Sequence, residues 1–107
     1  MICRVWHGWT MAQNADAYER LLKSEIFVTI ASRNIDGYRG IQLLRRDNDD
    51  EVEFTTMMWF TSIDAVRAFA GEDYTRAIVP PEAQALLTRY DNRSAHYDVR
   101  EDQRAGP

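Results

Sequence analysis

The sequence has little that would tie the chain to a membrane, a nucleic acid or an oxidising compartment. Cys3 is its one cysteine, so no internal disulfide can form, and we expect a reducing, cytoplasmic location. No apolar run approaches the roughly 20 residues of a membrane-spanning helix, and the N-terminus lacks a signal-peptide pattern. The 13 basic residues are outnumbered by 17 acidic ones, which disfavours nucleic acid and anionic membrane as partners.

Motifs for metal or nucleotide chemistry are missing as well. The sequence contains no CxxC, HExxH, GxSxG or glycine-rich phosphate loop. Its acidic run, Asp47-Asn48-Asp49-Asp50, lacks the glycine and the glutamate that complete an EF-hand calcium loop, so we expect a solvated turn. We therefore expect neither a bound metal nor another cofactor.

Hydrophobic patterning divides the chain into one domain, residues 1–100, and a polar tail, residues 101–107. Strands are predicted over 2–10, 38–46, 51–60 and 90–100, and helices over 15–31, 62–70 and 81–89, the first of them capped by Asn14. The order is β-α-β-β-α-β with one additional short helix. This order predicts an α+β, ferredoxin-like fold, in which helices cover one face of a four-stranded antiparallel sheet.

The segment from Met57 to Tyr74 carries the clearest local signals. Ser62 is a good helix N-cap, because its hydroxyl can accept a free amide hydrogen of the first turn. Gly71 suits the left-handed position just past the helix end. Trp59 stands where the strand ends, a place at which a large flat side chain can wall a pocket.

Large side chains occupy both faces of the predicted strands. Trp6 opposes Trp9 on the first strand, and Phe54 opposes Met57 on the third. Helices can cover only one face of such a sheet, so a second sheet is expected on the other, most simply in a twofold homodimer. A monomer with a partly apolar open face is the alternative.

The pattern resembles the antibiotic biosynthesis monooxygenase family, within the dimeric α+β barrel superfamily. The resemblance covers residues 2 to about 100. It is carried by Val5-Trp6-His7-Gly8-Trp9-Thr10, Gly37-Tyr38-Arg39-Gly40, Trp59 with the helix Ser62 to Ala70, Asp73-Tyr74, and Ala95-His96-Tyr97-Asp98-Val99. Members similar to this chain include cofactor-free oxygenases of polyketide quinols, haem-degrading enzymes and small isomerases.

The resemblance to the quinol oxygenases implies a small aromatic or hydrophobic ligand and no cofactor. A deprotonated anthrone or hydroquinone can pass an electron to oxygen itself, so the protein must hold a flat anion and exclude water. The implied catalytic residues are His7 as a base and Trp59 as a wall. The implied substrate-binding residues are Arg4, Trp6, Trp9, Arg39, Glu53, Met57 and His96. The haem branch is disfavoured, because the position of its iron-ligating histidine falls within residues 76–79, which contain no ligand for iron.

Each candidate also has a plainer interpretation. His7 is more often a buried, hydrogen-bonded histidine than a base, and His96 with Asp98 more often forms an exposed ion pair. Glu53 is either a cavity acid with a raised pKa or the cross-strand partner of an arginine of the second strand, such as Arg45. Two other functions therefore remain open: a non-redox isomerase or lyase that uses His7 or His96, and a non-catalytic protein that binds a small hydrophobic ligand.

Overall fold

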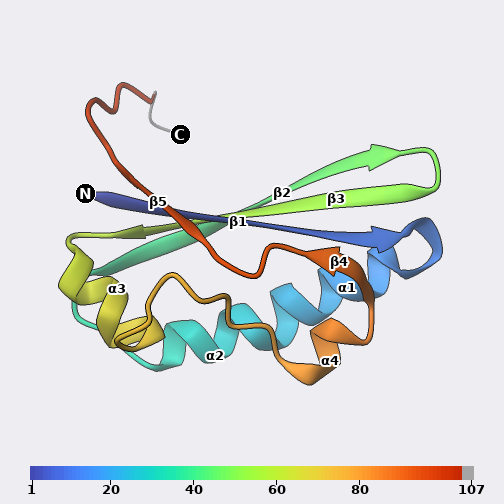
Figure 1. The fold of residues 1–107 in the computed structure, drawn as a ribbon, viewed down its shortest axis with the longest axis horizontal. Coiled ribbons are helices and arrows are strands. Elements are labelled where there is room, and N and C mark those ends of the chain that lie inside the picture. The colour runs from blue at the N-terminus through green and yellow to red at the C-terminus, as the bar shows by residue number, and fades with distance from the viewer. Residues whose placement is uncertain (105–107) are drawn as a thin grey trace.

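The computed structural model describes residues 1–104 and confirms an α+β fold with helices on one face of an antiparallel sheet (Figure 1). The strands are β1 (Ile2–Met11), β2 (Tyr38–Asn48), β3 (Glu51–Phe60), β4 (Leu87–Tyr90) and β5 (Ala95–Asp98). The helices are α1 (Ala15–Leu21), α2 (Phe27–Ser32), α3 (Ile63–Ala70) and α4 (Pro81–Gln84), with a 3-10 turn η1 (Ala12–Asn14) and a π-helical turn η2 (Leu22–Ile26). No helix in this part of the chain is long and apolar enough to span a membrane.

The last predicted strand, residues 90–100, is wrong as a single element. The sheet runs β2-β3-β1, and two short strands then share the free edge of β1: β4 pairs with Gly8–Thr10 and β5 with Ile2–Val5. Between them the chain leaves the ladder, because backbone groups of Asn92 and Ser94 bond to Ala77 and Thr75 instead. The sheet therefore has five strands in four positions.

Alternation along β1 and β3 gives the sheet two faces with different surroundings. Val52, Phe54, Met58 and Phe60 are buried on the face that the helices cover, called here the helix face. The register pairs Arg4 with Met58 and Trp6 with Thr56, so Arg4 and Trp6 share that face. The other face, called the open face, has no helix over it (Figure 1).

Two buried clusters fill the space between the sheet and the helices. The first joins β3 to α3 through Met58, Phe60, Val66 and Phe69, with Ile2 and Ala65; the second joins β3 to α1 and α4 through Tyr18, Leu22, Val52 and Phe54, with Ala15 and Ala83. Burial of these side chains is the main source of stability in a domain of this size. The candidate site lies where the two clusters meet.

The helix boundaries agree with the sequence in one case and differ in two. Ser62 caps α3, because its hydroxyl accepts the Ala65 amide hydrogen at 3.2 Å, and Gly71 follows with a φ of 90°. Asn14 makes no capping bond, since the η1 turn already winds the chain before α1. The helix that starts at Pro81 ends at Gln84 rather than Arg89, because Leu87–Tyr90 pairs with β1.

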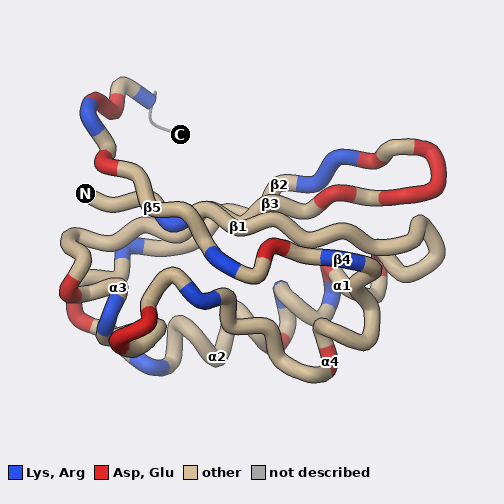
Figure 2. The backbone as a smooth tube through the Cα atoms, viewed as in Figure 1, with Lys and Arg blue, Asp and Glu red and all other residues tan. Residues whose placement is uncertain are grey.

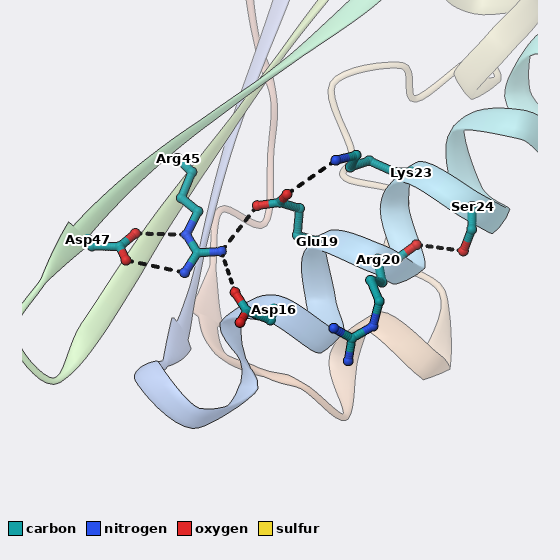
Figure 3. Close-up of polar contacts among 7 residues, drawn as sticks. All are labelled: Asp16, Glu19, Arg20, Lys23, Ser24, Arg45 and Asp47. Atoms are coloured by element: carbon teal, nitrogen blue, oxygen red, sulfur yellow. Dashed lines mark hydrogen bonds and ion pairs between the residues drawn. The ribbon is translucent and has the colours of Figure 1, made fainter.

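Arg45 ties the β2–β3 hairpin to α1 (Figure 3). Its guanidinium donates to Asp16 at 2.8 Å, Glu19 at 3.1 Å and Asp47 at 2.7 Å. The expected pair of Arg45 with Glu53 is therefore wrong: the register places Arg46 opposite Glu53. The hairpin ends in the predicted acidic turn (Figure 2). The turn is shorter than expected, because β2 extends to Asn48 and so includes the first two residues of the predicted loop.

We expect Arg45→Met to lower the thermal unfolding midpoint by about 2–4 °C at low salt, because one cation holds three carboxylates there. The loss should shrink in 1 M salt, where exposed ion pairs are screened. Arg20→Met on the same helix as Asp16 and Glu19 is the control, since Arg20 points away from Arg45 and forms no ion pair in the described chain (Figure 3). An equal loss at both salt concentrations would show that packing, not charge, is what Arg45 supplies.

Candidate functional site

A cavity of about 70 Å³ lies between the helix face of the sheet and the helices. Its walls are mainly apolar: Leu22 and Ile26 of the π turn, Ile41 and Met58 of the sheet, and Phe69 and Val79 opposite them. Such π turns often occur beside functional sites, and here the turn contributes two of the wall residues. Apolar walls with a few polar groups are typical of small-molecule sites.

A larger groove of about 400 Å³ continues the cavity toward solvent. The two share Ile26 and Ile30 of the helices, Phe69 of α3, and Ile78 and Pro80 of the following loop. Ile78 of this loop is 53% exposed, and the groove is also lined by the charged side chains of Glu25, Arg33 and Glu82. A planar ligand too long for the inner cavity can therefore extend along this groove.

Arg4 is the charged group of the cavity wall and is only 4% exposed. Its guanidinium donates to the carbonyl oxygens of Tyr74 and, at 3.2 Å, Arg76, and it lies 5.6 Å from the centre of the Phe69 ring. Burial lowers the pKa of Arg4 to about 10, so the group stays charged at neutral pH. None of the ion pairs within residues 1–104 includes it.

His96 is held beside Arg4 as an uncharged ring. Its Nε2 lies 3.1 Å from Arg4 Nη1, and a guanidinium can only donate, so Nε2 must accept and the ring proton must be on Nδ1. Burial, with the charge of Arg4 as a smaller cause, lowers the pKa of His96. The predicted ion pair with Asp98 is not among those of the described chain.

Tyr18 of α1, which the sequence analysis did not single out, brings a hydroxyl to the cavity. The residue is 1% exposed, its ring packs edge-on against Phe54 at 4.9 Å, and its hydroxyl has no hydrogen-bond partner within residues 1–104. Burial raises the pKa of Tyr18, so the phenol stays protonated and can donate. Thr56 and Ser94 add two further buried hydroxyls to the same walls.

Trp6 supplies the flat part of the wall and is fixed from two sides. Its Nε1 donates to the carbonyl oxygen of Asp91 at 2.9 Å, and its ring lies 6.2 Å from that of Tyr90. A Cβ atom at Gly8 would stand 2.5 Å from the far edge of the indole. The glycine is therefore what lets the ring lie across β1.

Of the predicted residues, Arg4 and Trp6 line this cavity, and His96 contacts Arg4 without lining it. By strand alternation, His7, Trp9, Glu53, Met57 and Trp59 belong to the open face. Arg39 and Trp59 border a separate hollow of about 280 Å³, where the Trp59 indole donates to Gln42 at 3.2 Å and Arg104 lies 4.8 Å from its ring centre. The structure thus brings together Arg4, Trp6 and His96, and separates them from His7 and Trp59.

His7 has a partner that the sequence did not reveal. Its Nδ1 lies 2.7 Å from Asp91 Oδ2, which also accepts the His7 backbone amide hydrogen at 3.1 Å. Asp91 therefore fixes His7 on the open face with its carboxylate and Trp6 on the helix face with its carbonyl. The signal for this contact is the turn-forming pair Asp91-Asn92, which interrupts the last strand.

Comparison with known proteins gives a fold but no closer kinship. No family model matches the sequence, and no curated protein does. Among solved structures, a Bacillus cereus protein named as an antibiotic biosynthesis monooxygenase is 13% identical, with 97% of each chain covered and a TM-score of 0.66.

Two further structures carry more specific names. The heme degrader MhuD of Mycobacterium tuberculosis, with two hemes bound in its active site, is 21% identical over 96% of this chain and 99% of its own, with a TM-score of 0.57. A mutant of SnoaB, a cofactor-independent oxygenase of Streptomyces nogalater, is 19% identical over 94% and 95%, with a TM-score of 0.57. The fold predicted from the resemblance is confirmed.

The cavity residues do not fit a heme. Its lining contains no histidine or cysteine, and Tyr18 is kept protonated by burial and so offers no phenolate to iron. Within residues 1–104, no three His, Cys, Asp or Glu side chains gather to hold a metal ion.

Proposed function

We propose that the chain is a cofactor-independent monooxygenase that acts on a flat aromatic substrate of the quinol or anthrone type in the helix-face cavity. One observation carries the proposal: an apolar slot that contains a protonated, unpartnered phenol and a buried guanidinium without a carboxylate partner. That combination suits a substrate that binds as an anion or becomes one. The fold shared with SnoaB, whose name states an oxygenase without a cofactor, is consistent with it.

The reaction requires little from the protein beyond binding and electrostatics. The anthrone first loses a C–H proton to solvent. Its anion passes one electron to O₂, the radical pair forms a C–O bond, the peroxide anion takes up a proton, and the hydroperoxide loses water to leave the quinone. The balance is one anthrone and one O₂ to one anthraquinone and one water. Tyr18 would donate a hydrogen bond to the substrate oxygen, where the negative charge collects, and the positive field of Arg4 would favour loss of the proton.

Trp6 and the apolar walls would hold the ring system and keep water away from the anion. His7 and Trp59 have no part in this site, because they lie on the open face. His96 would act through Arg4, whose guanidinium it contacts at 3.1 Å. It would be a positioning residue.

The proposal is tested by following oxygen uptake and quinone formation with 1,8-dihydroxyanthrone and several hydroquinones. We expect one O₂ consumed for each quinone formed, at a rate well above that of buffer. A rate equal to that in buffer with every one of these substrates would contradict the oxygenase proposal. Conversion that continues under nitrogen would point to an isomerase or lyase instead.

We also propose that two copies associate through the open face. Large apolar side chains gather there from four strands without a helix to cover them: Val5, Trp9, Leu44, Met57, Trp59 and Tyr97, of which Leu44 is 47% and Tyr97 58% exposed. A second sheet of the same kind would remove this surface from water in a twofold arrangement. The helix-face cavity would remain accessible in such a dimer.

Met57→Arg is expected to dissociate the dimer, because it places a charge in the middle of the contact. Sedimentation at micromolar concentration should give twice the chain mass of 12.5 kDa for the natural protein and the single mass for the variant. Val28→Arg, on the exposed side of α2, is the control and should leave the dimer intact. A single-chain mass for the natural protein would refute the dimer.

A cytoplasmic location is proposed for the same molecule. Cys3 is buried, and burial raises the pKa of its thiol, which favours the unreactive protonated form. A free, protected thiol is compatible with a reducing compartment. Fractionation of the producing cells would test this location.

A further inference from the structure

The loop between α3 and α4, residues 71–80, forms the outer wall of the cavity. Ile78, Val79 and Pro80 line the cavity, and Ile78 and Pro80 also line the groove that continues it toward solvent. Residues 71–80 contain no helix or strand. Loops that cover a site in this way commonly control the passage of ligands. Displacement of this loop would therefore open the cavity to the groove.

Arg4 fastens the loop to the sheet. Its guanidinium donates to the carbonyl oxygens of Tyr74 and, at 3.2 Å, Arg76, and no other side chain of β1 bonds to residues 71–80. The Arg76 carbonyl and the Ala77 amide belong to one peptide unit, and that amide donates to a carbonyl of the β4–β5 connection at 2.9 Å. Arg4 therefore holds one side of this peptide unit, and the connection holds the other.

His96 holds the Arg4 side chain in turn. The two residues are directly opposite in the pairing of β1 with β5, and His96 Nε2 accepts from Arg4 Nη1 at 3.1 Å. The Tyr74 ring stands edge-on to the imidazole, with 5.2 Å between the ring centres. His96 thus contacts both the cation and a loop residue that the cation holds. It can do so only as an uncharged ring, because a protonated Nε2 has no lone pair with which to accept.

We propose that His96 is a pH-sensitive latch on this loop: the uncharged ring keeps the loop closed over the cavity, and protonation releases it. Protonation replaces a hydrogen bond by two cations 3.1 Å apart in a partly buried place, where they repel more strongly than in water. If Arg4 then withdraws, the carbonyls of Tyr74 and Arg76 lose their donor. If His96 turns outward instead, the Tyr74 ring loses its edge-on contact. Either movement loosens the loop at Tyr74.

The described residues around His96 offer its protonated form no counter-ion. The charged and titratable side chains on the surrounding elements are Arg4 of β1, Asp98 of β5, Arg67 of α3, and Asp73, Tyr74 and Arg76 of the loop. Within residues 1–104, Asp98 forms no ion pair with His96, and Asp73 is held by Arg93 at 2.8 Å. Arg67 lies 5.3 Å from the centre of the Tyr74 ring and adds positive charge. Protonation is therefore opposed as long as the loop is closed.

The closed loop should lose stability as the pH falls below about 6.5. Burial, with the charge of Arg4 as a smaller cause, holds the pKa of His96 below its ordinary value of about 6.5. A released His96 would titrate near that ordinary value, so the open state binds the proton more readily than the closed one. Above about pH 6.5 neither state is protonated, and the latch is fully effective. As the pH falls from there to the lowered pKa, the population of the open state rises.

Hydrogen exchange of the Ala77 amide tests the latch in the natural protein without any ligand. Its protection factor, which corrects for the pH dependence of exchange itself, should fall about fivefold or more between pH 7.5 and pH 5.0, in step with protonation of the His96 ring followed by NMR. The Ala12 amide, bonded to the Asp50 carbonyl at 3.1 Å beyond the end of β1, is the internal reference and should keep its protection. Constant Ala77 protection while His96 titrates would overturn the inference. A His96 ring still uncharged at pH 5.0 would overturn it as well.

Substitution of each histidine in turn separates the latch from other effects of acid. His96→Gln keeps a side-chain oxygen that can accept from Arg4 but cannot be protonated, so the Ala77 protection should match that of the natural protein at pH 7.5 and should not fall at pH 5.0. His7→Gln is the matched control, because His7 is the other of the two histidines and lies on the open face. It should leave the acid response complete.

Three results with these variants would contradict the latch. An acid response that persists in His96→Gln would assign it to another group, and one that disappears in His7→Gln would assign it to the open face. If the loop of His96→Gln were already open at pH 7.5, the shape of the imidazole, rather than its charge, would be what holds Arg4.

The latch and the oxygenase proposal fail independently, because the latch does not depend on the reaction that takes place in the cavity. Hydrogen exchange requires neither substrate nor oxygen, so a loop that opens in acid without any oxidation of quinols would contradict the oxygenase proposal and leave the latch standing. Oxidation of quinols by a protein whose loop stays closed at pH 5.0 would do the reverse.

Discussion

Tyr18→Phe is expected to lower the turnover of 1,8-dihydroxyanthrone about 100-fold while leaving the stability of the protein nearly unchanged. Removing one donor that faces a developing oxyanion commonly costs a factor of 10² to 10³. The stability should change little, because the hydroxyl makes no hydrogen bond within residues 1–104 that the substitution would remove. Activity should thus fall while stability stays nearly the same.

Oxygen uptake gives the rate, and urea unfolding gives the stability of the same preparation. Tyr38→Phe is the matched control: Tyr38 is partly buried and packs against Phe60, but it does not line the cavity. It should leave turnover within about twofold. An equal loss of rate in both variants would show that the cavity phenol has no special role.

The sequence alone predicts the strands and helices whose signals are local. The alternation of Val52, Phe54, Met58 and Phe60 predicts β3 from end to end, and Ser62 with Gly71 marks the limits of α3. The split between β4 and β5 was not predictable in this way. It depends on backbone bonds to Thr75 and Ala77, which lie in a loop with no pattern of its own.

The site was predicted only in part, because the face of a residue depends on register. Trp59 stands next to the helix start, but alternation gives the helix face to Phe60 and leaves Trp59 on the open face. On β1 both faces carry aromatics, so only the pairing of Arg4 with Met58 shows which of them the helices cover. Local pattern alone cannot supply that pairing.

The role of Tyr18 in the cavity could not be predicted from the sequence for a different reason. Its position in the apolar stripe of α1 is that of a core residue, and its ring does pack in the core against Phe54. Whether its hydroxyl meets a partner or a cavity depends on side chains from β1, β3 and the loop after α3. The same residue thus serves packing with its ring and the candidate site with its oxygen.

Phe54→Ala is expected to destabilise the fold by about 3–5 kcal/mol, the usual cost of deleting a buried phenyl ring. Phe54 is 0% exposed, supports the Tyr18 ring at 4.9 Å and lies 5.6 Å beneath the Arg45 guanidinium. Since a domain of this kind is stable by only about 5–15 kcal/mol, the variant should be close to unfolding at 37 °C. Urea unfolding should show a lower midpoint with an unchanged slope.

Two controls separate packing from other causes of this loss. Val28→Ala, at a side chain that is 58% exposed on α2, should change the stability by no more than about 0.5 kcal/mol. Phe54→Leu should recover more than half of the loss, because it refills most of the space under Tyr18. All three should be unfolded at one protein concentration, because association would otherwise shift the midpoints. If Phe54→Leu were as unstable as Phe54→Ala, the edge-on contact with Tyr18, rather than the buried volume, would be what stabilises this end of the cavity.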